Sequence, residues 1–558
     1  MELLHRHRAP GRRTLRLGTV GGVVTLLTAA LLSTGSTVGA GAADAPSPER
    51  GAHGPAASTV VRTDDGAVRG RAESTARVFQ GIPYAAPPVG DLRWASPRRA
   101  KPWQGVRDAT KPGNRCAQAP GVIDEPSTTE DCLFLNVTTP RATGKRKLPV
   151  MVWLHGNGFI SGAASLYGAQ RLADKGDVIV VSPNYRLGIF GFLSHPALDH
   201  GKARNLSGNF GLEDQQAALR WVQRNAKAFG GDPGNVTIFG ESAGGTSVCS
   251  QLAAPTSAGL FHRAIVQSAQ CTGRKWSPGP PTWFPLPRAD RQKNGLDVAA
   301  KAGCAKPETA AACLRAKPAG KLAKLSDVGV GSGPTVGGGF LPRSPERAFA
   351  TGRFNRVPVM QGTTRDEHHL FTAAIETATG KVTTPDSYRE QLAALFDPAD
   401  LRRVLARYPV AKYHSAGEAL STVVTDWAWG CPAQGRDRAL AAHTPVYSYE
   451  FADGTAPWFS ALPKPNFPTG AFHGAELEYL FEDEQLPGPQ TPAQRQLSTT
   501  MISYWARFAA TGNPNGGEQP RWKPFQGDGW VQSLATTTIG RTDRGAEHQC
   551  AFWKTIGS

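Results

Sequence analysis

The chain has 558 residues, of which 40% are hydrophobic and 19% charged, with a formal net charge of +17 at pH 7. This composition is ordinary for a globular protein and excludes a collagen or a coiled coil, and the length allows one large enzyme domain. Because the basic residues are scattered and do not alternate with aromatic residues, we interpret them as solvated surface and expect no nucleic-acid partner.

Residues 1–43 have the pattern of a secretory signal peptide. A basic start is followed by an apolar segment, Leu17–Leu32, which is short for a membrane span, and Ala40–Ala42 offers a small-residue cleavage site. Arg12–Leu17 loosely resembles a twin-arginine signal. Removal of five arginines and one glutamate from +17 leaves about +13. We therefore expect a secreted protein without a stable membrane span.

A flexible linker rich in Pro, Gly and Ala is predicted over residues 44–58. Organised sequence begins with a predicted hairpin, in which Val60–Thr63 and Ala67–Gly70 flank an Asp-Asp-Gly turn. No internal linker divides the remainder. We expect residues 59–558 to form a single domain with a helical insertion at roughly 300–472.

Two continuous apolar runs, Leu148–Leu154 and Val178–Ser182, are predicted to be strands of a sheet covered on both faces. A glycine-rich loop, His155–Phe159, follows the first run directly. At this position the strand-to-helix loop of an α/β-hydrolase supplies backbone N–H groups to an oxyanion. The alternative interpretation is an ordinary glycine-rich turn.

The segment Gly240–Gly244 has the pattern G-x-S-x-G around Ser242. Helical spacing of apolar residues predicts a helix over 212–229, and a buried strand is predicted over 235–239, directly before the motif. A further helix is predicted after it. Strand, sharp turn and helix are the context in which a serine hydroxyl becomes an exposed nucleophile, although the pattern alone is weak.

A serine nucleophile needs a histidine to take its proton and a carboxylate to orient that histidine. Asp366 and Glu367 follow an apolar run at 357–360, and His473 lies on a loop further along the chain. The order serine, acid, histidine is that of α/β-hydrolases. Spacing alone chooses neither between the two acids nor between His473 and the other candidate histidines. Those other histidines are His368, His369 and His548.

Several longer motifs resemble the type-B carboxylesterase family, which contains cholinesterases, carboxylesterases and some fungal lipases. The resemblance runs from about Gly66 to Trp553 and is closest to the secreted, bacterial type of carboxylesterase. The motifs are Phe79–Ala85 with Pro87–Gly90, Glu130–Val137, Asn184–Gly188 and Phe229–Gly245. The resemblance implies an α/β-hydrolase fold, with a large, mostly parallel central sheet, helices on both faces and helical insertions.

By this resemblance Ser242 is the nucleophile, Glu367 the acid and His473 the base. Asn157, Gly158 and Ala243 take the oxyanion positions, Ser268 resembles a serine that supports the acid, and Glu241 a residue that helps to position His473. Asn157 stands where the family usually has glycine. Its N–H can still donate, and Asn tolerates a positive φ better than most residues.

Eight cysteines in an exported chain predict disulfides, and none has a C-x-x-C or Cys/His spacing, so neither a metal nor another cofactor is expected. Spacing alone allows many pairings. The family resemblance implies the pairs Cys116–Cys132, Cys304–Cys313 and Cys431–Cys550. Whether Cys249 pairs with Cys271 or stays a buried thiol is left open.

The implied activity is hydrolysis of small-molecule carboxylic esters through an acyl-enzyme. Two alternatives are a lipase that prefers long acyl chains and a non-catalytic, cholinesterase-like recognition protein. The aromatic residues Trp427, Trp429, Trp458 and Phe459 lie between the acid and the base and are interpreted either as pocket lining or as core. Acyl and alcohol preference and the oligomeric state do not follow from the sequence.

Overall fold

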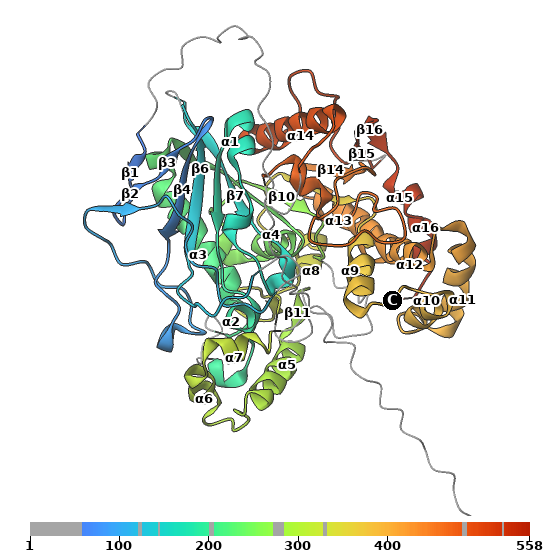
Figure 1. The fold of residues 1–558 in the computed structure, drawn as a ribbon, viewed down its shortest axis with the longest axis horizontal. Helices are drawn as coiled ribbons and strands as arrows, with labels where there is room; N and C mark the ends of the chain where they lie inside the picture. Colours follow the sequence, from blue (N-terminus) through green and yellow to red (C-terminus); the bar gives the residue numbers. More distant parts are fainter. Residues whose placement is uncertain are drawn as a thin grey trace, which may run out of the picture.

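An 11-stranded sheet runs through the centre of the molecule (Figure 1). The computed structural model describes residues 58–120, 125–142, 146–199, 206–271, 284–326, 332–482, 488–526 and 529–557. The predicted signal peptide, and all of the predicted linker except Ser58, lie outside the described residues.

The sheet is parallel in its middle and antiparallel toward its edges. Seven neighbouring strands, from β15 to β8, pair in parallel, whereas β16, β6, β4 and β3 pair antiparallel with their neighbours. This arrangement confirms the expected mostly parallel sheet. The strands in spatial order are β16 (Ile539–Thr542), β15 (Val531–Leu534), β14 (Val446–Phe451), β13 (Val359–Thr364), β10 (Arg263–Gln267), β9 (Gly231–Glu241), β7 (Leu148–Leu154), β8 (Ile179–Pro183), β6 (Phe134–Pro140), β4 (Ala76–Pro83) and β3 (Arg71–Ala72).

Strand β7 shows why the middle strands are apolar throughout. Successive side chains of a strand point to opposite faces of the sheet. In β7, Val150 and Val152 belong to one hydrophobic core, and Met151 and Trp153 belong to the other. Because helices cover both faces, neither set meets water, so a continuous apolar run is favoured over an alternating one.

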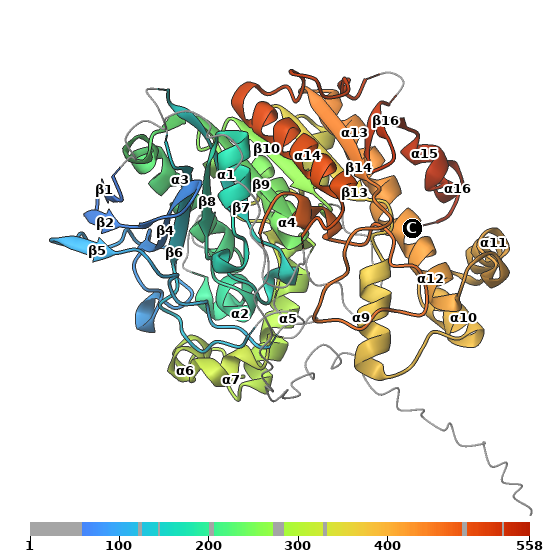
Figure 2. The same ribbon diagram turned by 45° about the horizontal axis from the view of Figure 1, so that its top comes forward.

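Two layers of helices enclose the sheet, as Figures 1 and 2 show from two sides. Helices α1 (Gln170–Gly176) and α14 (Pro492–Thr511) pack on one face. The opposite face is covered by α3 (Phe210–Asn225), α4 (Ala243–Ala253), α8 (Pro345–Ala350) and α13 (Cys431–Ala441). This three-layer arrangement confirms the α/β fold class.

Two further helix groups, each with its own hydrophobic cluster, flank the sheet (Figure 1). One contains α2 (Gly188–Phe192), α5 (Arg288–Lys301), α6 (Ala310–Ala316) and α7 (Ala319–Ala323). The other contains α9 (His369–Thr379), α10 (Pro385–Ala393), α11 (Pro398–Arg407), α12 (Ala416–Val424), a π-helix (Thr425–Gly430) and α16 (Cys550–Trp553), next to α15 (Arg544–Glu547). None of the helices in the described part of the chain is both long and apolar enough to cross a membrane.

Most predicted elements correspond to observed ones with small shifts. Strands β1 (Val60–Arg62) and β2 (Ala67–Arg69) form the predicted hairpin, and β5 (Val106–Asp108) adds to them. The predicted helix 212–229 is α3 followed by a 3₁₀ turn. The interval 300–472 contains helices α6 to α13, but also β13 and β14 of the central sheet. A small two-stranded sheet pairs β11 (Leu286–Pro287) with β12 (Thr335–Val336).

All eight cysteines are paired. The structure forms the disulfides Cys116–Cys132, Cys249–Cys271, Cys304–Cys313 and Cys431–Cys550. The pair that sequence reasoning left open, Cys249–Cys271, joins helix α4 to the segment after β10. The last pair joins the start of α13 to α16, across 119 residues of sequence.

Candidate active site

The loops that carry the predicted site segments start at one edge of the sheet. The register places the end of β7 opposite Gly240 of β9, and Gln267 of β10 opposite both Glu241 of β9 and Gly362 of β13. Since these strands are parallel, their carboxyl ends lie at the same edge, which is where open α/β sheets place their ligands. The topology therefore brings together segments that are more than 200 residues apart in sequence.

Ser242 stands on a strained turn between β9 and α4. Its φ of 58° and ψ of −121° are unusual for a residue with a side chain. Its N–H donates to the carbonyl of Gln267 at 3.0 Å, which fixes the turn against β10. A Cβ on Gly244 would lie 1.8 Å from the carbonyl oxygen of Leu154, so only glycine lets α4 approach β7 this closely. This is the geometry of a nucleophile elbow.

The predicted oxyanion loop lies directly against Ser242. A Cβ on Gly156 would lie 3.2 Å from the Cβ of Ser242, so the absent side chain leaves room for the serine. Asn157 and Gly158 both have positive φ, 65° and 61°, and Asn at this position is compatible with that conformation. Ala243 begins α4, and the N–H groups of a first helical turn have no acceptor within the helix. The loop and the start of the helix, both of which contain backbone N–H groups, therefore lie next to Ser242.

His473 and Glu367 form a buried pair. Nδ1 of His473 lies 2.5 Å from Oε2 of Glu367, whose Oε1 accepts a hydrogen bond from the N–H of Thr364 at 3.0 Å. The neighbouring Asp366 instead accepts from the N–H of Ala471 at 2.7 Å. Tertiary structure therefore decides between the two acids, and only Glu367 reaches the histidine.

The three histidines that were alternatives to His473 as the base contact other groups or stay neutral. Nδ1 of His369 lies 2.9 Å from a backbone carbonyl oxygen, and His548 lies between two carboxylates of the π-helix and β14. Burial lowers the pKa of His368 to about 3, so this ring stays neutral at physiological pH. Of the four candidates, His473 is the one that contacts Glu367.

Glu241 and Glu476 add two more buried carboxylates to the site. Oε1 of Glu241 lies 3.0 Å from Nε2 of His473, and within the described part of the chain no hydrogen bond joins that nitrogen to Ser242 Oγ. Glu476 lies three residues after His473 in a 3₁₀ turn, and its side chain is fully buried. Sequence reasoning did not single out Glu476, because nothing in its spacing shows which way the turn directs it.

The proton affinities of these groups depend on one another. Burial raises the pKa of Glu241 to about 7 and the pKa of Glu476 to about 8, and the negative charge of Glu367 acts in the same direction. Burial alone would lower the pKa of His473, but the carboxylates of Glu241 and Glu367 outweigh it and raise this pKa to about 9. Near neutral pH the imidazole of His473 is therefore mostly charged. Glu241 and Glu476 are not both fully ionised at this pH.

Two aromatic rings lie against the imidazole of His473. The ring centres of Phe371 and Trp429 are each 4.9 Å from that of His473, and 5.7 Å from each other. Trp429 is one of the four aromatic residues proposed as lining or core, and it contacts the candidate site directly.

The other three aromatic residues belong to hydrophobic cores. Trp458 and Phe459 both pack on the ring of Phe472, which precedes the histidine, and Trp427 packs on Phe396. Each of them is at most 8% exposed. Burial and ring contacts therefore favour the core interpretation for these three residues.

Ser268 is strained but does not bond the acid. Its φ is 46°, and its N–H donates to the carbonyl of Gly362 on β13 at 2.9 Å. Its hydroxyl is buried and, among the described residues, has no hydrogen-bond partner. The family resemblance implies that Ser268 supports Glu367, but no hydrogen bond from the Ser268 hydroxyl to Glu367 is found among the described residues. The N–H of Thr364 donates to the Glu367 carboxylate instead.

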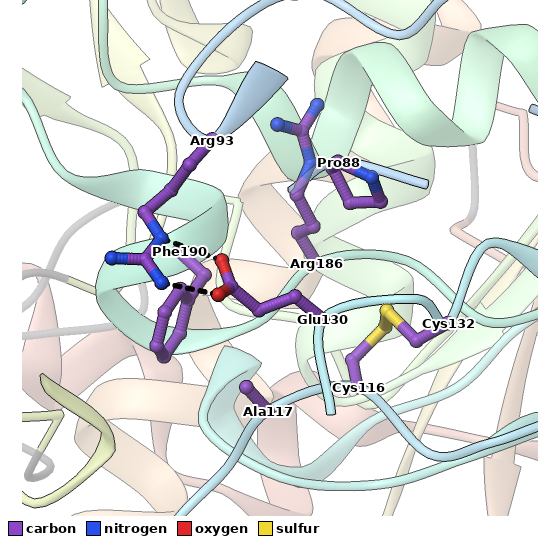
Figure 3. Close-up of a pocket in the computed structure, with 8 residues that line it drawn as sticks. All are labelled: Pro88, Arg93, Cys116, Ala117, Glu130, Cys132, Arg186 and Phe190. Atoms are coloured by element: carbon purple, nitrogen blue, oxygen red, sulfur yellow. Dashed lines mark hydrogen bonds and ion pairs between the residues drawn. A yellow bond between two sulfur atoms is a disulfide. The ribbon is translucent and has the colours of Figure 1, made fainter. Parts of the chain in front are cut away.

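A small cavity of about 10 Å³ beside the Cys116–Cys132 disulfide is separate from this site. Figure 3 shows the ion pair between Arg93 and Glu130 and the side chain of Arg186 at its wall. The volume suits about one water molecule and no substrate. None of the residues that line it belongs to the candidate site, and no group of His, Cys, Asp and Glu suited to a metal ion occurs within the described ranges.

Comparison with known proteins identifies relatives along nearly the whole chain. The model of the Carboxylesterase family matches residues 57–553. A para-nitrobenzyl esterase of Bacillus subtilis (strain 168) is 37% identical, with 82% of this chain and 90% of the relative aligned, and a liver carboxylesterase of Sus scrofa is 34% identical, with 90% and 94% aligned. A solved structure of PNB esterase superposes with a TM-score of 0.72 at 34% identity, covering 88% of this chain and all of that one.

Proposed function

Because the chain belongs to the carboxylesterase family and is a carboxylic ester hydrolase, we propose that it cleaves its substrates through an acyl-enzyme on Ser242. The observation that carries the proposal is the buried pair of His473 and Glu367, 2.5 Å apart. His473 also lies 3.0 Å from Glu241, which directly precedes the serine on its strained elbow. A serine hydroxyl is a poor nucleophile without such a base and a group that orients it.

In the proposed reaction His473 takes the proton of Ser242 while Oγ attacks the ester carbonyl carbon. The carbonyl oxygen becomes an oxyanion, which the N–H groups of Asn157, Gly158 and Ala243 stabilise. His473 then gives its proton to the leaving alcohol. Water repeats the sequence and releases the carboxylic acid, while Glu367 stabilises the imidazolium in both halves.

The proposal requires Nε2 of His473 to move from Glu241 toward Ser242. In the structure this nitrogen lies 3.0 Å from Oε1 of Glu241. Catalytic hydrogen bonds are often loose before substrate binds and tighten in the reacting complex. Once His473 is neutral, its Nε2 no longer attracts the carboxylate of Glu241, so Glu241 positions the imidazolium but does not hold the neutral base.

The test is hydrolysis of a series of p-nitrophenyl esters by the mature protein, by Ser242→Ala and by Ser250→Ala. Ser250 lies on the same helix, and among the described residues its hydroxyl donates only to the carbonyl of Thr246, so this variant controls for loss of a buried serine. Ser242→Ala should lose roughly four to six powers of ten in kcat, whereas Ser250→Ala should stay near the unmodified protein. Equal rates for Ser242→Ala and the unmodified protein would exclude the mechanism.

An organophosphate label separates this function from a non-catalytic recognition protein. The reagent should modify Ser242 once per molecule, and a protein without an activated serine should take up no label. The same ester series tests whether the protein is a lipase. Hydrolysis rates that rise with acyl-chain length and on emulsified substrate would favour that alternative.

We also propose that the protein is exported. The basic and apolar pattern of residues 1–43 and the four disulfides support this proposal. N-terminal sequencing of the protein recovered outside the cell should begin near Ala43. A start at Met1 in the recovered protein would contradict it.

A further inference from the structure

His548 joins three elements of the structure in a buried cluster of charges. Its Nδ1 lies 2.6 Å from Oδ1 of Asp426 in the π-helix, and its Nε2 lies 2.8 Å from Oε1 of Glu450 in β14. The same Glu450 oxygen lies 3.4 Å from Nε of Arg544 in α15. The hydroxyl of Tyr408 donates to the other oxygen of Asp426 at 2.8 Å. The C-terminal segment is thus tied to the π-helix and to the central sheet.

The histidine in this cluster is an imidazolium at physiological pH. Burial alone would lower its pKa, but the carboxylates of Glu450 and Asp426 outweigh burial and raise the pKa of His548 to about 10. The charges of His548 and Arg544 lower the pKa of Glu450 to about 2 despite its burial. The charged groups that face His548 are Asp426 of the π-helix, Glu450 of β14, and Arg544 and Glu547 of α15.

The π-helix packs closely against the histidine ring. The N–H of Cys431 donates to the carbonyl of Asp426, five residues before it, which is the wide turn of a π-helix. A Cβ on Gly430 would lie 2.7 Å from Cγ of His548, so the backbone touches the ring without a side chain between them. The position of His548 therefore limits where the π-helix can lie.

The same short helix also contacts His473 and the residue that follows Glu367. Oγ1 of Thr425 accepts a hydrogen bond at 2.9 Å from the N–H of His368, the residue after Glu367. The ring of Trp429 lies 4.9 Å from the ring of His473. The π-helix thus connects the C-terminal charge cluster to the backbone next to Glu367 on one side and to the ring of His473 on the other.

We propose that His548 is a positioning residue for ester hydrolysis: through Asp426 it fixes the π-helix, which in turn holds Trp429 against His473 and Thr425 against the backbone that follows Glu367. The inference rests on the proposed function of Ser242, Glu367 and His473. The coupling is carried by a contiguous chain of contacts rather than by proximity of His548 to the substrate.

The test compares His548→Gln and Asp426→Asn with His414→Gln. His414 is an exposed histidine whose side chain also pairs with a carboxylate, Glu418, so its variant controls for loss of a histidine–carboxylate pair. Active sites are first counted by titration with an organophosphate, so that the kinetics refer to folded enzyme only. The values of kcat and KM per titrated site are then measured on a p-nitrophenyl ester from pH 5 to 10.

His548→Gln and Asp426→Asn should each lower kcat per titrated site by about tenfold, a size found for changes along contiguous networks, with a smaller change in KM. The acid limb of the kcat profile should move, because a displaced Trp429 changes the burial of His473, and burial acts on the pKa of this residue. His414→Gln should keep both the rate and the profile.

Trp429→Ala supplies a second, independent readout. If His548 acts through Trp429, adding His548→Gln to Trp429→Ala should lower kcat less than His548→Gln does in the unmodified protein, which is the non-additivity of coupled residues. Fully additive effects would overturn the proposed route.

Unchanged kcat per titrated site and an unchanged acid limb in the variants at positions 548 and 426, with only a lower melting temperature, would show that His548 serves stability alone. Should His548→Gln not fold, Asp426→Asn, which keeps the shape of the side chain, carries the test. Failure of the unmodified protein to react with the organophosphate would instead reject the proposed function.

Discussion

At the scale of single residues, the site is governed by competition for protons among buried groups. Glu241, Glu367 and Glu476 surround one imidazole, and water does not screen them. Each negative charge stabilises the imidazolium of His473 and makes ionisation of the next carboxyl group harder. The pKa of the proposed base is therefore set by residues that need not touch the substrate.

The first prediction concerns Glu241→Gln. Only neutral His473 can act as the base, so kcat/KM should rise as the pH passes upward through its raised pKa, given above as about 9. Removal of the charge of Glu241 should lower that pKa and move the acid limb to lower pH by roughly one unit. The pH profile of kcat/KM measures the shift, and exposed Glu346→Gln serves as the control. A limb that stays in place or moves to higher pH would contradict the assigned role.

At the scale of elements, the elbow depends on how closely α4 approaches β7. The strained φ of Ser242 and the close contact at Gly244 have one cause. The chain must turn sharply from β9 into α4 while α4 packs against β7. The π-helix between α12 and α13 is a second irregular element that directs side chains, and it carries Trp429 to His473. Irregular backbone is thus found where the candidate site is built.

Gly244→Ala should therefore be destabilising and should lower esterase activity. The added Cβ would lie 1.8 Å from the carbonyl of Leu154, and forced overpacking of this kind costs about 1–3 kcal/mol. Gly435→Ala on α13 is the matched control, because a Cβ there meets nothing within 4 Å and should be neutral or stabilising by up to about 1 kcal/mol. Thermal melting and ester hydrolysis of the two variants measure the difference. Equal behaviour of both variants would be incompatible with the packing argument.

At the scale of the whole molecule, a central sheet carries the site and disulfides hold its periphery. The Cys431–Cys550 pair joins α13 to α16 across a sequence separation of 119, whereas Cys304–Cys313 spans a separation of 9. A cross-link that closes a long loop removes more entropy from the unfolded chain than one that closes a short loop. The first pair is therefore expected to contribute more to stability than the second.

Replacement of both cysteines by serine should show this difference. In the chain-entropy model the Cys431/Cys550 double variant should lose about 5 kcal/mol and the Cys304/Cys313 double variant about 3 kcal/mol. Since large, disulfide-bonded proteins often unfold irreversibly, half-lives at elevated temperature are the suitable measurement. A shorter half-life for the Cys304/Cys313 double variant than for the Cys431/Cys550 double variant would contradict the expected order.

Much of the fold was predictable from local sequence. Apolar runs marked β7 and β8, and the helical spacing before residue 229 marked α3, because burial on one or both faces leaves a periodic signal in the residues themselves. The motif around Ser242 and the family signatures also lie in short continuous segments. Helix ends were less predictable, and the predicted helix 212–229 proved to end as a 3₁₀ turn.

The sequence by itself determined the family, the fold class, the position of Ser242 on its elbow and the order of the candidate acid and base. Only the tertiary structure turned Glu367 rather than Asp366 toward His473 and paired Cys249 with Cys271. It also placed Trp429 and Glu476 near His473, and put His548 between the carboxylates of Asp426 and Glu450. The physical reason is that local signals come from neighbours along the chain, whereas these contacts join residues from different strands and helices. Their meeting depends on the register of parallel strands and on the layers packed over them, which no short segment specifies.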